Sequence, residues 1–171
     1  KEIADYAARG YQRAKIKIGR DHDPERLRVL VEAGAGMGLM VDAHGAYTVK
    51  QALAIAELAT GVEYFQEPVS SDDLAGLRRV REHAPMAIAA GEYGYDAGYY
   101  RGMIDAVDIV QCDATRCLGI TGFLQVDAMC DAAGVPVSSP CAPAIHVHAA
   151  AASRRLPHIE HFPDHLRLQP M

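Results

Sequence analysis

Three acidic residues stand at equal intervals in the sequence, each at the end of a short hydrophobic run. They are Asp42 in MVDAHG, Glu67 in YFQEPV and Glu92 in AAGEYG. The intervals, 67 minus 42 and 92 minus 67, are both 25 residues. A (β/α) barrel has about 250 residues in eight strand–helix units, so each interval advances by one strand around the ring. The spacing therefore predicts three carboxylates at one mouth of a barrel.

Three carboxylates that converge in a partly apolar cavity repel one another unless a cation neutralises them. Ligands that are all oxygen, at an open mouth, favour Mg²⁺ and then Mn²⁺ over a structural zinc ion. Any one of these acids alone is equally typical of a helix N-cap or a solvated loop. Because the three share one spacing, we expect Asp42, Glu67 and Glu92 to be metal ligands.

Two lysines, Lys15 and Lys17, lie two residues apart in the run AKIKIG. Side chains alternate between the two faces of a strand, so both lysines share one face. A lysine that points into a barrel is desolvated and close to other cations, and both conditions help its amine to act as a general base. The alternative is an exposed edge strand whose lysines are solvated.

Further polar residues follow the same strands. His44 lies two residues after Asp42 and would share its face, which makes it either a general acid beside the metal or a loop histidine bonded to nearby backbone. Asp113 ends the fifth hydrophobic run and Glu160 lies on the last one, so both are candidates for the same mouth.

Other motifs point away from different chemistry. His146 and His148 in APAIHVHAA fall where a helix should begin, so we expect packing or capping roles for them rather than a metal pair. The sequence contains no P-loop, no G-x-S-x-G and no cysteine–histidine nucleophile arrangement.

The elements that must position these residues alternate regularly along the chain. Short β-rich runs are separated by segments with apolar residues near helical spacing, which is typical of β-α units on a parallel sheet. No linker or shift in composition marks a boundary, so we expect one continuous catalytic domain over residues 1–171, and the first residues read as the back half of a helix in a larger protein. The expected strands are 14–19, 38–44, 62–68, 86–92, 107–113, 135–140 and 158–162.

Composition narrows the class of partner. The formal net charge is -5 and the sequence pI is about 5.9, which offers no positive field for nucleic acid or an anionic membrane. A small-molecule substrate is therefore expected, with no nucleic-acid and no membrane partner. The four cysteines form no C-x-x-C pair, and no apolar run reaches the length of a membrane helix, so we expect a soluble, cytoplasmic protein with reduced thiols.

The quoted pieces KIKIG, VDAHGAY, FQEP, AAGEYGYD, CDATRCLGITGF and HIEHF resemble, in order and spacing, the mandelate racemase and muconate lactonising branch of the enolase superfamily. The resemblance implies an α/β fold, a (β/α)7β barrel of the TIM type from which the first strand and an N-terminal capping domain are absent here. It also implies an enzyme, a lyase or an isomerase, that uses Mg²⁺ to abstract the α-proton of a carboxylate substrate through an enediolate. A homo-oligomer is expected for the full-length protein.

The same resemblance implies roles for single residues. Lys17 matches the base, and Lys15 matches a neighbouring lysine that neutralises the substrate carboxylate and tunes its partner. Asp42, Glu67 and Glu92 match the metal ligands, as the spacing had predicted. Glu160 matches an acid that binds the substrate carboxylate.

Two positions bear on which reaction is performed. In mandelate racemase-like enzymes an aspartate–histidine dyad stands opposite the lysine; Asp113 fits the aspartate, but Pro140 occupies the histidine position and can transfer no proton. His44 stands where some acid-sugar dehydratases carry the acid for the departing hydroxyl. Dehydration of an acid sugar is therefore expected; the alternatives are a racemase or epimerase of a 2-hydroxy acid and a metal-binding barrel without turnover.

Overall fold

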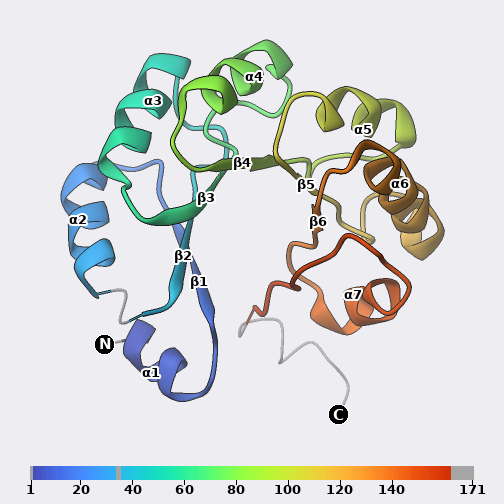
Figure 1. Ribbon diagram of the computed structural model, residues 1–171, viewed down its shortest axis with the longest axis horizontal. Coiled ribbons are helices and arrows are strands. Elements are labelled where there is room, and N and C mark those ends of the chain that lie inside the picture. The colour runs from blue at the N-terminus through green and yellow to red at the C-terminus, as the bar shows by residue number, and fades with distance from the viewer. Residues whose placement is uncertain (1, 34–35, 163–171) are drawn as a thin grey trace. The chain divides into compact units, whose positions relative to one another are not determined.

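The computed structural model describes residues 2–33 and 36–162, so residues 34 and 35 of the helix expected near 24–35 lie outside the described part, as do residues 163–171. Within it, six strands alternate with helices, and the chain divides into two compact units, Lys1–Ala89 and Ala90–Met171. Every strand pairing inside a unit is parallel. The alternation of strand and helix predicted from the sequence is therefore confirmed (Figure 1).

The first unit is built on strands that pair in chain order. Lys17 is in register with Asp42, and Asp42 with Gln66, so the ends of the first three strands are level. The helices of this unit run beside the strands, as Figure 1 shows for α2 and α3. Its elements are α1 Glu2–Ala8, β1 Arg13–Lys17, α2 Asp23–Ala33, β2 Gly38–Asp42, α3 Val49–Leu58, β3 Val62–Gln66, α4 Leu74–His83 and β4 Ala87–Ala90, the last of which reaches one residue into the second unit.

Local signals in the sequence explain where the helices of the first unit begin. Thr48 caps α3 in a capping box with Gln51, and Asp73 caps α4 by accepting the Gly76 N–H. Apolar faces of these helices pack on the strands and form a buried core. Its members include Leu27, Val41, Ala52, Phe65, Leu77, Val80 and Ile88.

Up to residue 162, the second unit holds two short strands and three helices. Val110 and Gln111 of β5 pair with Val137 and Ser138 of β6. Asp96 caps α5, and Gly134 ends α6 in the left-handed conformation with φ +73°. The elements are α5 Ala97–Ile104, β5 Ile109–Gln111, α6 Gly119–Ala133, β6 Val137–Ser138 and α7 Pro143–Ala150, and the core includes Tyr100, Met103, Val110, Phe123, Val126 and Val137.

The last strands are shorter than the sequence predicted. The run 135–140 gives only the two residues of β6, and the run 158–162 is reduced to one isolated bridge between Ser139 and Ile159. Pro140 explains the early end of β6, since it has no N–H with which to extend a ladder. The polar residues that follow each strand therefore lie on loops.

Candidate functional site

The amines of two lysines reach one buried carboxylate in the first unit. Lys17 Nζ lies 2.5 Å from Asp42 Oδ2, and Lys15 Nζ lies 3.5 Å from the same oxygen. Lys15 also donates to Gln66 Oε1 at 2.8 Å. The Asp42 side chain is 0% exposed, whereas that of Lys17 is 39% exposed. Both lysines therefore share a face, as alternation predicted, and Lys17 is the one open to an incoming molecule.

His44 completes this cluster from the loop after β2. Its backbone N–H donates to Asp42 Oδ1 at 3.1 Å, and its φ of +49° is unusual for a residue with a side chain. The ring Nε2 contacts Lys17 Nζ directly and lies 3.1 Å from Asp42 Oδ2. The Lys17 amine, the His44 Nε2 and the Asp42 carboxylate oxygen therefore lie in mutual polar contact. The arrangement lets a proton pass between the amine and the imidazole.

Glu67 is the first residue after β3 and adds a second buried carboxylate to the same unit. Its side chain is buried, and its backbone has φ +42°, again outside the range that most side chains favour. Backbone hydrogen bonds fix this conformation, because the Glu67 N–H donates to the Ala89 carbonyl and the Glu67 carbonyl accepts from Gly45. Asp42 and Glu67 thus supply hard oxygen donors from neighbouring strand ends, which fit Mg²⁺ chemically.

A second hydrogen-bond network holds the backbone of Lys17 through its carbonyl. Asp23 is buried and accepts from the backbone of Gly19 at 2.7 Å and from the Tyr47 hydroxyl at 2.6 Å. Arg26 pairs with Asp23 at 2.7 Å and donates from Nη2 to the Lys17 carbonyl at 2.9 Å. Burial and the bond to Asp23 both raise the pKa of Tyr47, which keeps its hydroxyl a donor. The network ties the loop after β1 to the loop after β2.

Glu92 lies in the second unit, on the loop after β4. The preceding residue, Gly91, has φ +129°, and a Cβ built there would lie 2.6 Å from the Gln111 carbonyl oxygen. Only glycine fits this place. The Tyr100 hydroxyl donates to the Gly91 carbonyl at 3.1 Å and lies 3.3 Å from that of Gly94, so the loop is held on both sides of Glu92.

The three expected metal ligands are therefore divided between the two units. Among residues 2–33 and 36–162, no group of three or more His, Cys, Asp or Glu side chains stands close enough to hold a metal ion. Asp42 and Glu67 belong to the first unit and Glu92 to the second. The shared metal site of the three stays a prediction.

Asp113 is the centre of a different cluster in the second unit. It is buried two residues after β5, and its Oδ1 accepts from the Thr115 N–H at 2.8 Å and the Thr115 hydroxyl at 2.7 Å. Its Oδ2 lies 3.6 Å from Arg116 Nε, and the Arg116 guanidinium lies over the Tyr93 ring, 5.3 Å from its centre. One cation and several hydrogen bonds thus hold the Asp113 carboxylate in place.

Cys141 reaches this cluster from the residue after Pro140. Its thiol donates to Asp113 Oδ2 at 3.6 Å, and its backbone N–H donates to Glu160 Oε2 at 3.3 Å. Burial, the charge of Asp113 and the bond to it raise the pKa of the Cys141 thiol to about 12. Asp113 and Glu160 are therefore joined through one residue, and a thiol meets Asp113 although Pro140 offers no side-chain donor.

Two of these participants were missed in the sequence. A polar last residue in the strand VEYFQ is a signal that singles out Gln66, but its register with Asp42 comes only from the structure, since alternation from Glu67 puts Gln66 on the opposite face. Cys141 gave no such signal, because its contact depends on a turn after β6 in which periodicity fails. His146 also has contacts that its position on a helix did not predict, and His148 is exposed on the same helix.

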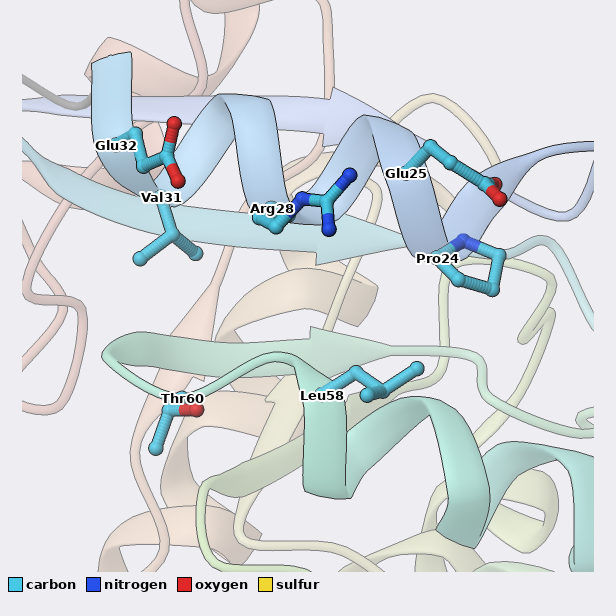
Figure 2. A pocket seen from close by; sticks show the side chains of 7 residues that line it. All are labelled: Pro24, Glu25, Arg28, Val31, Glu32, Leu58 and Thr60. Carbon is cyan, nitrogen blue, oxygen red and sulfur yellow. The ribbon is translucent and has the colours of Figure 1, made fainter.

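A hollow in the first unit lies away from these residues. Figure 2 shows side chains from α2, among them Pro24 and Arg28, that face Leu58 and Thr60 at the end of α3. None of the predicted metal or catalytic residues lines it. The hollow is a groove between helices and is separate from the polar clusters at the strand ends.

The chain is similar to proteins of one known family. The family described as enolase C-terminal domain-like matches residues 1–171. The chain is 33% identical over 144 residues to D-galactarolactone cycloisomerase of Agrobacterium fabrum, which covers 80% of this chain and 38% of that protein. It is 31% identical to arabinonate dehydratase of Saccharolobus solfataricus (80% and 39%) and 28% identical to L-Ala-D/L-Glu epimerase of Bacillus subtilis (78% and 39%).

Solved structures give the same family. A mandelate racemase/muconate lactonizing enzyme-like protein from Rubrobacter xylanophilus is 47% identical, with a TM-score of 0.92 over 98% of this chain and 49% of that one. L-talarate dehydratase from Polaromonas, solved with Mg and L-glucarate, is 27% identical with a TM-score of 0.87 over 96% and 48%. The chain spans about two fifths of the curated relatives named above and about half of these solved chains. It belongs to the mandelate racemase and muconate lactonising branch of the enolase superfamily.

Proposed function

We propose that the full protein removes the α-proton of an acid-sugar carboxylate with the help of Mg²⁺ and then eliminates a β-hydroxyl as water. The observation that carries this proposal is the direct contact of Lys17 with both Asp42 and His44. It unites a base, an expected metal ligand and an acid in one cluster. The relatives named as arabinonate dehydratase and L-talarate dehydratase support the reaction class, and relatives solved with magnesium support the metal.

The expected ligands would be Asp42, Glu67 and Glu92, and Mg²⁺ held there would neutralise the negative charge that develops on the substrate carboxylate. Lys15 is well placed to add positive charge, since its amine already lies 3.5 Å from Asp42 and is largely buried. Glu160 would bind the substrate carboxylate through a proton shared with it, the role that the family resemblance gives this residue.

The two proton transfers can use one proton. Lys17 takes the α-proton from the substrate carbon, and its ammonium form donates to the His44 Nε2 that it already contacts. His44 then protonates the departing β-hydroxyl. The carbon–hydrogen and carbon–oxygen bonds break, one water leaves, and both side chains return to their starting protonation states. The product is the enol of a 2-keto-3-deoxy acid.

The test is to incubate the full protein with a library of aldonic and aldaric acids and Mg²⁺ in deuterated water. A 2-keto-3-deoxy product whose formation needs Lys17 supports the proposal. Turnover that survives Lys17→Ala would contradict it. Lys50→Ala is the matched control, because Lys50 is exposed at the start of α3, outside the cluster.

An epimerase is the second candidate, and the Asp113–Cys141 contact favours it. That pair offers a proton donor for the substrate carbon despite Pro140, and the relatives include L-Ala-D/L-Glu epimerase. In the same experiment, deuterium at the α-carbon without loss of water would select this candidate. Metal binding with neither outcome would select a barrel that binds without turnover.

A further inference from the structure

His146 is a fully buried histidine on α7 whose two ring nitrogens both have backbone partners in the second unit. Nε2 lies 2.9 Å from the Ala114 N–H donor, and Nδ1 lies 2.9 Å from the Cys141 carbonyl and 3.1 Å from the Ala142 carbonyl. A backbone N–H can only donate and a carbonyl can only accept. These partners place the ring proton on Nδ1 and make Nε2 the acceptor of the Ala114 N–H.

These partners belong to the two loops that follow β5 and β6. Ala114 is next in sequence to Asp113, and Cys141 carries the thiol that meets Asp113. One imidazole thus bridges the backbones on either side of the Asp113–Cys141 contact. Asp113 Oδ1 lies only 3.5 Å from His146 Nε2, which places the carboxylate against the same ring.

The loop after β6 needs such a support because its backbone is strained. Cys141 and Ala142 have φ values of +45° and +38°, and neither is glycine. The left-handed conformation is unfavourable for a residue with a side chain, so two in succession persist only when their surroundings hold them. His146 can hold this turn directly, since its Nδ1–H lies within hydrogen-bonding distance of the carbonyls of both strained residues.

We propose that His146 is a positioning residue, which holds the turn at Cys141 so that its thiol meets Asp113 and its N–H meets Glu160. Its effect on catalysis rests on the proposed function, in which Glu160 binds the substrate carboxylate. Its effect on the turn does not. A histidine that only fills space beside Phe123, whose ring centre is 5.9 Å away, could be replaced by phenylalanine without moving Cys141.

The test measures how fast iodoacetamide alkylates Cys141 in the folded full protein at pH 8, with mass spectrometry to separate the four thiols. Cys112, Cys117 and Cys130 are buried and serve as internal references for intact folding. The charge of Asp113 raises the pKa of the Cys141 thiol and so lowers the fraction of reactive thiolate. If His146→Phe lets the turn move away from Asp113, alkylation of Cys141 should become about tenfold faster, because the thiolate fraction rises. His148→Phe, two residues further along the same helix and exposed, should leave the rate unchanged.

Two further variants separate the two hydrogen-bonding nitrogens. In His146→Asn the side-chain amide can replace the Nδ1 donor but cannot reach Ala114, whereas in His146→Gln it can replace the Nε2 acceptor but not the donor at the turn. We expect slow alkylation to be retained in His146→Asn and lost in His146→Gln. Equal rates in both, or a wild-type rate in His146→Phe, would overturn the proposal. If His146→Phe also exposes the reference thiols, the Asn and Gln pair decides.

Turnover provides an independent reading. If the proposed function holds, His146→Gln should raise KM about tenfold with kcat changed less than twofold, because the Cys141 N–H would no longer hold Glu160, the residue expected to bind the substrate carboxylate. Equal increases in KM in His146→Gln and His146→Asn would contradict the positioning role. Failure of every acid sugar as a substrate would count against the proposed function alone, since the alkylation rates need no substrate.

Discussion

The two polar clusters are built in different ways, although both stand where strands end. In the cluster of the first unit, side chains in strand register make the central contacts, with Lys17 beside Asp42 and two lysine amines near one carboxylate, and His44 joins from the loop after β2. The cluster of the second unit consists of loop residues, with Asp113 and Cys141 brought together by a strained turn and a buried imidazole. Strand geometry maintains the first contact, and loop contacts maintain the second.

The electrostatics differ in the same sense. In the first cluster the Asp42 carboxylate lies beside the amines of Lys15 and Lys17, and the His44 imidazole contacts the Lys17 amine. In the second, Asp113 faces a hydroxyl, backbone N–H groups, a partly exposed Arg116 and a thiol whose pKa is raised. The first arrangement suits rapid proton abstraction, whereas the second suits a donor that keeps its proton until a carbanionic carbon takes it.

The largest effect is expected for Lys17→Met in the full protein. The variant retains the length of the side chain but removes the base, so turnover and α-proton exchange should both fall by about 10³ to 10⁴-fold. Rates of deuterium incorporation, followed by NMR, measure this directly. A loss below tenfold would show that the base lies elsewhere.

Gly91→Ala tests the rigidity of the second unit beside Glu92. The new Cβ would meet the Gln111 carbonyl and must adopt φ +129°, so the free energy of unfolding should fall by about 3 kcal/mol. Gly134→Ala is the matched control, because Gly134 also has positive φ but no atom within 4 Å of its Cβ position. Its cost should be about 1 kcal/mol. Urea unfolding that gives equal losses would mean the crowding at Gly91 is relieved cheaply.

His44→Asn tests whether dehydration needs His44 as the acid for the departing hydroxyl. Removal of the imidazole should lower the rate of dehydration by about 10²-fold while α-proton exchange by Lys17 continues, because the two steps use different groups. The ratio of exchange to product formation measures this separation. His83→Asn, at an exposed site on α4, is the control and should change neither rate. If exchange and dehydration fall together, His44 serves Lys17 rather than the leaving hydroxyl.

The difference between strand contacts and loop contacts also explains how well the sequence predicted each cluster. Alternation along a strand and the 25-residue interval depend on regular backbone geometry, so the shared face of Lys15 and Lys17 and the strand-end position of Asp42 could be derived. The fold class followed from the alternation of strand and helix for the same reason. The reading failed where regular geometry ends, as at Ile159, where an expected strand gave one bridge.

Asp113 and Glu160 were candidates from the sequence, but the contacts of Cys141 and His146 that join the second cluster could not be predicted, because they depend on a turn of two non-glycine residues with positive φ. Nothing in the letters PCAPAIH indicates that the imidazole of His146 returns to the carbonyl of Cys141. The sequence did show that Pro140 excludes a side-chain proton donor at its own position. It could not show that the next residue would take the contact with Asp113.

The smallest effect we consider concerns the support behind Lys17. Burial alone would raise the pKa of Asp23, but hydrogen bonds from Tyr47, Arg20 and Gly19 and the charge of Arg26 outweigh it and hold the pKa below its ordinary value of 3.8. A carboxyl with a lower pKa in the folded state stabilises the fold above about pH 4, and this contribution is lost as the pH falls through the folded-state pKa. Asp23→Asn should therefore cost about 1.5 kcal/mol at pH 7.

The pH dependence distinguishes this role from simple packing. The difference in unfolding free energy between wild type and Asp23→Asn should be constant from pH 7 to pH 5 and should shrink below pH 4, where the wild-type carboxyl takes up its proton. Asp21→Asn, at an exposed residue of the same loop, should show almost no difference at any pH. A difference that stays constant down to pH 2 would mean that Asp23 supports Lys17 through its shape and not its charge. The first cluster would then depend on local packing as much as the second one does.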